Sequence, residues 1–261
     1  MPGARRALRA VGAAGFLAVA ATGAGLDASL LTGTGTQGTV TGGRAVAFAD
    51  PLVAACAREI AANKVAHVTF LRAVLGSAAA AMPAINIDGG ASGAFTAFAQ
   101  GTTLASPFDP YASDANFLLG AFLFADLSVT AYKAATPVLV ASDPYVEAAT
   151  GILGAEAYHA GLIRTTLYQQ GAATGSTLRA SAQAISDRRD SLDGTTDLDQ
   201  PLTVTDTTIS NVVPADGYGV AYSRTIAQVL NILFVSKAAT TKGGFFPAGI
   251  SGDANTSGAN G

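Results

Sequence analysis

The sequence of 261 residues contains one cysteine, two histidines, no tryptophan and few charged residues. The single cysteine, Cys56, excludes a disulfide within the chain and any cysteine-ligated zinc or iron–sulfur cluster. Because Cys56 lies among Ala and Val in a predicted helix, we expect a small buried side chain and not a reactive thiol. Charged residues make up 13% of the chain, the net charge is −3, and there is no long basic run. The composition therefore predicts no nucleic-acid partner.

Apolar residues, by contrast, are plentiful. They make up 49% of the chain, which is ample for one large domain or for a compact core with an appended segment. Beyond the N-terminal segment, no stretch approaches 18 uninterrupted apolar residues. We therefore expect no permanent membrane span.

The N-terminal segment, residues 1–24, has two interpretations. Arg5, Arg6 and Arg9 precede an apolar stretch, and small residues follow. This order is typical of a secretory signal peptide, and the adjacent arginines resemble a twin-arginine signal. It predicts export to the periplasm, cell wall or medium by the Sec or twin-arginine route. The alternative is a retained first helix of the fold, and it predicts a cytoplasmic protein.

Residues 31–43 alternate Gly with Thr and predict an exposed loop. The helix that follows has clear ends. Asp50 can cap its free N–H groups, Pro51 suits its first position and Gly76 can end it. Between these residues, apolar side chains recur at three-to-four spacing.

Four more helices are predicted further along the chain. The first is apolar nearly all round, which indicates burial on several sides. Weak helical character surrounds Phe95 and Phe98 in the long connection before it, and strand character is confined to residues 202–204. The four predicted helices are 113–135, the segment between a Ser142 cap and Gly171, 176–192 and 225–237. The predicted fold class is all-α.

Both histidines lie within predicted helices. His159 follows Glu156 by three residues, which places a carboxylate and an imidazole on one helix face. Carboxylate-bridged di-metal proteins take one such Glu-x-x-His pair from each of two helices and one Glu from each of two others. These donors suit iron or manganese. The alternative for a single pair is a surface Glu beside a hydrogen-bonded His.

His67 lacks the corresponding carboxylate. Lys64 stands three residues before it, where a second Glu-x-x-His pair needs its Glu. A protonated lysine cannot ligate a metal, and its charge repels a cation.

Six stretches resemble one protein family, in the family's order, between about residue 31 and residue 252. They are similar to the desiccation-related, ferritin-like proteins of plants and bacteria. The stretches are FDPYASDANFLLGAF (108–122), TAYKAA (130–135), GILGAEAYHAGLIRTTLY (151–168), ISDRRDSLDG (185–194), AYSRT (221–225) and KGGFFPAGISG (242–252).

This resemblance implies an up-down, four-helix ferritin-like bundle with a C-terminal helical and loop extension. The expected parts are a signal-like segment or degenerate first helix (1–24), a bundle core (25–172) and an extension that packs on the bundle (173–261). Bacterial members are often exported. If residues 1–24 are removed, the missing wall of the bundle is filled by the helix at 225–237 or by a second copy in a homodimer.

The chain also departs from the family's metal-site pattern. Lys64 stands where the family tends to have Glu before its first His, and Ala125, next to Asp126, stands where a middle helix has Glu. The signal-like segment occupies the place of a Glu-rich first helix. His67, Glu156 and His159 are what is left of the implied ligand set.

Three ligands and water can hold one ion, but a bridged pair of metals needs more carboxylates. We expect Lys64 to replace the lost cation and to pair with Glu156 inside the bundle, because a buried unpaired Glu is costly. The alternative is that Lys64 extends to solvent and Glu156 is half exposed.

The sequence therefore predicts a non-catalytic, ferritin-like desiccation or stress-associated protein with a degenerate di-metal site and no cofactor. The alternative is a metal-dependent redox protein that binds one iron or manganese ion at His67, Glu156 and His159. Hydrolase chemistry is not supported, because no serine lies in a Gly-x-Ser-x-Gly motif.

Overall fold

The computed structural model of the protein describes residues 10–139, 143–203, 208–252 and 255–260. Helices dominate these residues, so the predicted all-α class is confirmed. The α-helices are α1 (Ala10–Thr22), α2 (Pro51–Leu75), α3 (Ala94–Ala99), α4 (Asp114–Ala135), α5 (Asp143–Gln170), α6 (Leu178–Asp193) and α7 (Ile226–Phe234). Two short strands, β1 (Val40–Thr41) and β2 (Ile85–Asn86), pair in parallel.

Capping side chains set the helix boundaries. The Asp50 side chain accepts a hydrogen bond from the backbone N–H of Leu52 at the start of α2. Ser113 caps α4 in the same way, and Thr225 forms a capping box at α7. The predicted Ser142 cap of α5 lies outside the described residues. The helices predicted from residues 51, 113 and 176 onward are confirmed to within about two residues.

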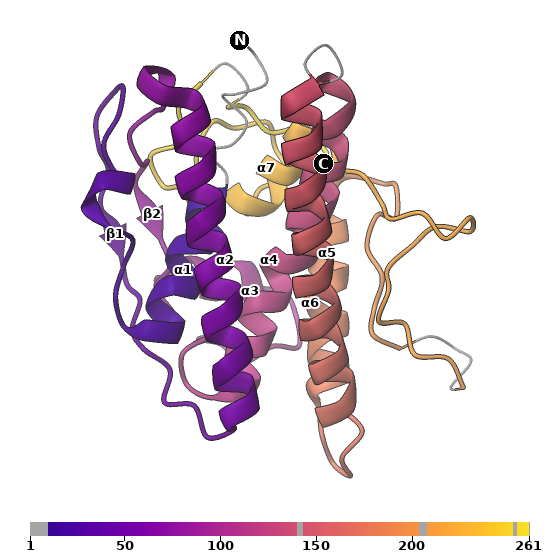
Figure 1. Ribbon diagram of the computed structural model, residues 1–261. Coiled ribbons are helices and arrows are strands. Elements are labelled where there is room, and N and C mark those ends of the chain that lie inside the picture. Colours follow the sequence, from indigo (N-terminus) through magenta and orange to yellow (C-terminus); the bar gives the residue numbers. More distant parts are fainter. Residues whose placement is uncertain (1–9, 140–142, 204–207, 253–254, 261) are drawn as a thin grey trace.

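The long helices lie side by side as a bundle, and β1 and β2 lie along one side of it (Figure 1, left). Helix α1 packs against α2 and α4, and α4 packs against α5 and α6. Helix α7 packs against α6 and α4. Side-chain contacts between α2 and α5, described below, join the two halves of the bundle.

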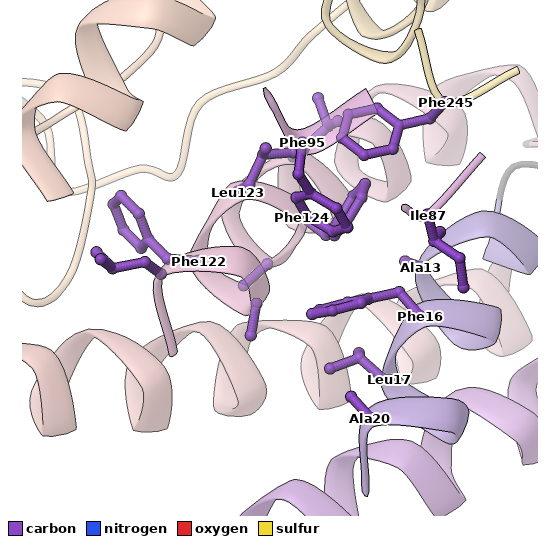
Figure 2. Packing of buried hydrophobic residues seen from close by; sticks show 14 of the residues in the cluster. Ala13, Phe16, Leu17, Ala20, Ile87, Phe95, Phe122, Leu123, Phe124 and Phe245 are labelled. Atoms are coloured by element: carbon purple, nitrogen blue, oxygen red, sulfur yellow. The ribbon is translucent and has the colours of Figure 1, made fainter. Parts of the chain in front are cut away.

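An aromatic cluster forms the centre of the core (Figure 2). The ring of Phe16, from α1, lies 5.0 Å from that of Phe95 and 5.8 Å from that of Phe124, measured between centroids. The ring of Phe245, near the C-terminus, lies 5.1 Å and 5.0 Å from the same two rings. Both ends of the chain therefore contribute to one core.

Residues 10–22 occupy the position of a first bundle helix. The side chains of Phe16, Leu17 and Ala20 are buried, and Figure 2 shows them facing the aromatic cluster. Both interpretations of the N-terminal segment, a signal peptide and a retained first helix, stay predictions. Arg5, Arg6 and Arg9 lie outside the described residues, and export stays a prediction.

Two features of the glycine-rich and connecting segments differ from the predictions. Residues 31–43 are not only a loop, because they contain β1 and bond to the backbone of residues 79–87. A Cβ at Gly38 would lie 2.0 Å from the backbone nitrogen of Ala84, so only glycine permits this approach. The predicted strand at 202–204 is wrong for its described residues: Thr203 makes only an isolated bridge to Ser210.

Two further predictions are corrected. Helix α7 ends at Phe234 and not at residue 237, because Val235 adopts a left-handed conformation with φ 53°. Cys56 is partly exposed and not buried. Part of the segment between α6 and α7 reaches away from the bundle (Figure 1, orange), whereas Asp199 and Arg224 of the same segment are buried.

Within the described part of the chain, α4 is the one helix long and apolar enough to cross a membrane. The rest of the chain buries 72% of its apolar window. This burial is what a central bundle helix requires, in agreement with the expectation of no permanent membrane span.

Candidate functional site

The predicted site residues come together where α2 and α5 lie next to each other. Lys64 and His67 share one face of α2, and Glu156 and His159 share one face of α5, because residues three apart in a helix point the same way. The four side chains meet between the two helices, and α4 adds Ser128.

A buried ion pair lies at the centre of this site. The Lys64 Nζ donates to Glu156 Oε2 over 2.5 Å and to Ser128 Oγ over 3.1 Å. The side chains of Lys64 and Glu156 are 4% and 1% exposed. The expected pairing is what the structure shows, and the alternative of a solvent-directed Lys64 with a half-exposed Glu156 is wrong.

The two histidines lie on either side of the carboxylate. His67 Nδ1 lies 3.2 Å from Glu156 Oε1, which is hydrogen-bond distance. His159 Nδ1 lies 3.8 Å from Glu156 Oε2, too far for a hydrogen bond. The His159 Nε2 contacts Asn63 Nδ2 at 3.1 Å. Among the described residues, His159 Nδ1 is buried and has no hydrogen-bond partner.

Electrostatics keep the carboxylate ionised. Burial alone raises the pKa of Glu156, but the charge of Lys64 and the hydrogen bonds from His67 and Lys64 outweigh burial and hold the pKa far below its usual range. Glu156 is therefore a fixed negative charge, and Lys64 provides the cation that balances it inside the bundle.

Helix α4 contributes no carboxylate to the site. Ala125 is buried, and its methyl group cannot ligate a metal. The carboxylate of its neighbour Asp126 instead accepts hydrogen bonds from Arg164 (2.7 Å) and Arg189 (2.9 Å). Helix α1 contains only Ala, Val, Gly, Phe, Leu and Thr, so it adds no ligand either.

The residues as they stand do not fit a di-metal centre. Two of the four carboxylates that such a centre draws from four helices are absent from α1 and α4, and a third is replaced by Lys64. Within the described ranges, no group of three or more His, Cys, Asp or Glu side chains is placed to hold a metal ion. The ammonium of Lys64 is already paired with the carboxylate of Glu156.

A second buried cluster of charges ties the C-terminal extension to the bundle. Arg189 donates to Asp199 over 2.8 Å, and Arg224 donates to Asp193 over 2.5 Å and to Asp199 over 2.6 Å. Burial alone raises the pKa of Asp199, but the charges of Arg189 and Arg224 outweigh it and lower the pKa. The cluster holds the segment before α7 against α6. These contacts give it a structural role.

Sequence reasoning missed several members of both clusters. Asn63 and Ser128 are common helix residues with no motif around them, so no local signal identifies them as partners of His159 and Lys64. The aspartates and arginines of the second cluster come from different elements that only the folded chain brings together.

Comparisons with known proteins agree with this architecture. The family model described as "Ferritin-like domain" matches residues 11–169, and this range begins inside α1. No solved structure matches the chain.

Two relatives were found among characterised proteins. The chain is 26% identical to the "Ferritin-like catalase Nec2" of Nesocodon mauritianus over 213 residues, which are 78% of this chain and 68% of that protein. It is 30% identical to the "Desiccation-related protein PCC13-62" of Craterostigma plantagineum over 164 residues, which are 59% of this chain and about half (52%) of that protein. The family match covers most of the chain and includes α2, α4 and almost all of α5. The chain therefore belongs to the ferritin-like, desiccation-related proteins.

Proposed function

We propose that this protein is a non-catalytic, stress-associated member of its family, in which a lysine has taken the place of the metal. The observation that carries the proposal is the Lys64–Glu156 pair, fully buried at the position where α2 and α5 would supply metal ligands. The bundle retains a cation at its centre without needing an ion from solution.

Physical chemistry supports a structural role for the pair. A buried carboxylate without a partner is strongly destabilising, so Glu156 needs a cation as long as it is present. Lys64 supplies that cation from within the chain, and Ser128 adds a hydrogen bond that holds its ammonium in place. Metal ions stabilise only proteins whose sites they can enter, and here the ammonium blocks entry.

The link to dehydration stress rests on similarity. The chain resembles a desiccation-related protein at 30% identity over 164 residues. A helical bundle whose core charge does not depend on a dissociable ion suits conditions in which ion concentrations change widely. Export, predicted from residues 1–24, is a separate proposal and is not required for this role.

The second candidate is a metal-dependent redox protein. It is favoured by the similarity to a ferritin-like catalase over 78% of this chain. His67, Glu156 and His159 would then hold one iron or manganese ion, and Lys64 would have to leave Glu156. The closeness of the Lys64–Glu156 contact argues against this candidate.

Metal content and peroxide turnover distinguish the two candidates. The purified protein, produced in medium supplemented with iron and manganese, is analysed for metals by mass spectrometry and assayed for consumption of hydrogen peroxide. A His159→Ala variant is the matched control. The structural proposal predicts no stoichiometric metal and no peroxide consumption in either protein. Near-stoichiometric iron or manganese, with a peroxide activity that the variant loses, would contradict it.

A further inference from the structure

Two neighbouring helices place their charged residues inside the bundle and uncharged residues outside. Between Glu147 and the end of α5, which the structure describes throughout, the charged residues are Glu156 and Arg164, and both are buried. In α2 beyond Glu59, likewise described throughout, the exposed residues are all Ala, Thr, Phe or Val. A surface helix normally has the reverse arrangement. We call the exposed residues of α2 beyond Glu59 and of α5 beyond Glu147 the α2–α5 face.

Large apolar side chains lie on this face. Tyr158 on α5 is 83% exposed, and Phe70 and Val74 on α2 are 44% and 37% exposed. A contact between Asn63 and His159 holds the two helices next to each other, and Figure 1 shows both helices on the near side of the bundle. An exposed apolar surface of this kind is typical of an interaction site.

The glycines of α5 point to a neighbour outside the chain. A Cβ built at Gly151, Gly154 or Gly161 would meet no described atom within 4 Å. Gly120 of α4 differs, because a Cβ there would lie 2.8 Å from the Cβ of Pro110. Glycine destabilises the interior of a helix relative to alanine, and packing within the described chain gives no reason for these three. Close approach of another molecule to the backbone of α5 would give one.

The shape of α5 fits a second copy of itself. Tyr158 follows Gly154 by four residues and precedes Gly161 by three, so a projecting ring and two positions without side chains share one side of the helix. If two α5 helices pack antiparallel about a two-fold axis, each Tyr158 ring can lie over the glycines of the other helix. One surface then supplies both complementary shapes, as an interface between identical subunits requires. Because the face is uncharged, two copies meet there without charge repulsion.

The size of the face also fits a stable dimer. The part of α5 from Thr150 to Gln169 is about 30 Å long at the helical rise of about 1.5 Å per residue. Two helices side by side are about 20 Å wide. The face therefore covers about 600 Å² on each copy, and two copies reach the lower limit of about 1,200 Å² for stable specific interfaces.

We propose that a second copy of this chain docks on the α2–α5 face, with α5 against α5 about a two-fold axis. The inference goes beyond the proposed function and does not depend on whether a metal binds. Because Lys64 and Glu156 lie between the same two helices, the second copy would also cover this ion pair from outside.

The test measures the mass of the full chain by analytical ultracentrifugation at concentrations from about 1 μM to about 100 μM, the range in which micromolar dimers dissociate. Tyr158→Glu places a charge on the proposed interface. Tyr218→Glu is the matched control, because Tyr218 is 93% exposed but lies in the segment between α6 and α7. Circular dichroism shows whether each variant is folded.

The native chain should have twice the mass of one chain. Tyr158→Glu should raise the Kd of the dimer at least about thirtyfold, as loss of a central aromatic residue in an interface does. Tyr218→Glu should leave the Kd unchanged.

Gly154→Ala gives a second measurement that distinguishes an interface from an ordinary helix surface. In the Tyr158→Glu chain, which is expected to be monomeric, Gly154→Ala should raise the midpoint of urea unfolding, because alanine favours a helix. In the native chain the same change should raise the Kd of the dimer, because the added methyl group prevents close approach. A change that raises the midpoint of unfolding and leaves the Kd unchanged would contradict the proposed packing of α5.

Three outcomes overturn the inference. The first is a native chain that is monomeric up to about 100 μM, a concentration at which an interface of standard size is occupied. The second is a dimer that Tyr158→Glu leaves intact. The third is a dimer that Tyr218→Glu dissociates and Tyr158→Glu does not, which would place the interface on the segment after α6. If Tyr158→Glu does not fold, Tyr158→Ser takes its place with the same criteria.

Discussion

At the scale of single residues, one substitution decides the chemistry of the site. Lys64 stands where the Glu-x-x-His pattern calls for a glutamate, and the substitution changes the charge at that position by two units. Its ammonium, 2.5 Å from Glu156, neutralises a carboxylate that is 1% exposed. Removing one partner of such a pair typically costs about 3–5 kcal/mol. Lys64 is therefore needed because Glu156 is buried. The pair as a whole is not an independent source of stability.

Asp193 gives a prediction at this scale, through pH. Burial raises its pKa to about 6, although Arg224 opposes the shift, and its Oδ1 has no partner among the described residues. Because the folded state then binds this proton more tightly than the unfolded state, Asp193 makes the free energy of unfolding increase as pH falls from about 6 to about 4. Asp193→Asn should remove this contribution, about 1–3 kcal/mol.

Urea unfolding of the native protein and of Asp193→Asn, at several pH values between 4 and 7, measures this contribution to the free energy of unfolding. The difference in unfolding free energy between native protein and Asp193→Asn should change across this window, with the native chain gaining on the variant as pH falls. The comparison cancels the opposite trend from carboxylates with lowered pKa, such as Asp199. A difference that is constant with pH would contradict the assignment.

At the scale of elements, local sequence determines the ends of α2, whereas the β1–β2 pairing depends on tertiary contacts. Asp50, Pro51 and Gly76 predict both ends of α2, because caps act within one turn. The strands β1 and β2 could not be predicted, since their pairing depends on backbone approach at glycines such as Gly38 and on no side-chain pattern. The early end of α7 depends on a left-handed Val235, an uncommon conformation for a β-branched residue.

Helix α1 is the element whose role the sequence left open. Its apolar residues fit either a signal peptide or a core helix, and charge order alone cannot separate the two. The structure shows what this helix contributes to the fold, because it places Phe16 among buried aromatic rings. A chain without residues 10–22 would leave Phe95 and Phe124 without one of their ring partners.

Phe16→Ala tests that contribution. Loss of a fully buried phenylalanine should lower the free energy of unfolding by about 3–5 kcal/mol. Leu52→Ala is the control, because Leu52 is 68% exposed and its truncation should change stability by less than about 0.5 kcal/mol. Equal stability of the native chain and Phe16→Ala in chemical denaturation would mean that α1 is not part of the folded core.

At the scale of the whole molecule, the two charge clusters connect different parts of the bundle. Lys64 and Glu156 join α2 to α5, and the arginine–aspartate cluster joins α4, α5 and α6 to the extension. The fold class and the Lys64–Glu156 pair could be predicted, because spacing and the cost of a buried charge are properties of the sequence. The second cluster could not, because no spacing motif links its members, which lie on different elements from Asp126 to Arg224.

The central claim is that an ammonium, and not a metal, is the cation beside Glu156. Anomalous X-ray diffraction from crystals soaked in manganese or iron salts tests it most directly. The account predicts no anomalous peak within bonding distance of Glu156, with Lys64 Nζ at hydrogen-bond distance from the carboxylate. An anomalous peak shared by His67, Glu156 and His159, with Lys64 displaced, would contradict it.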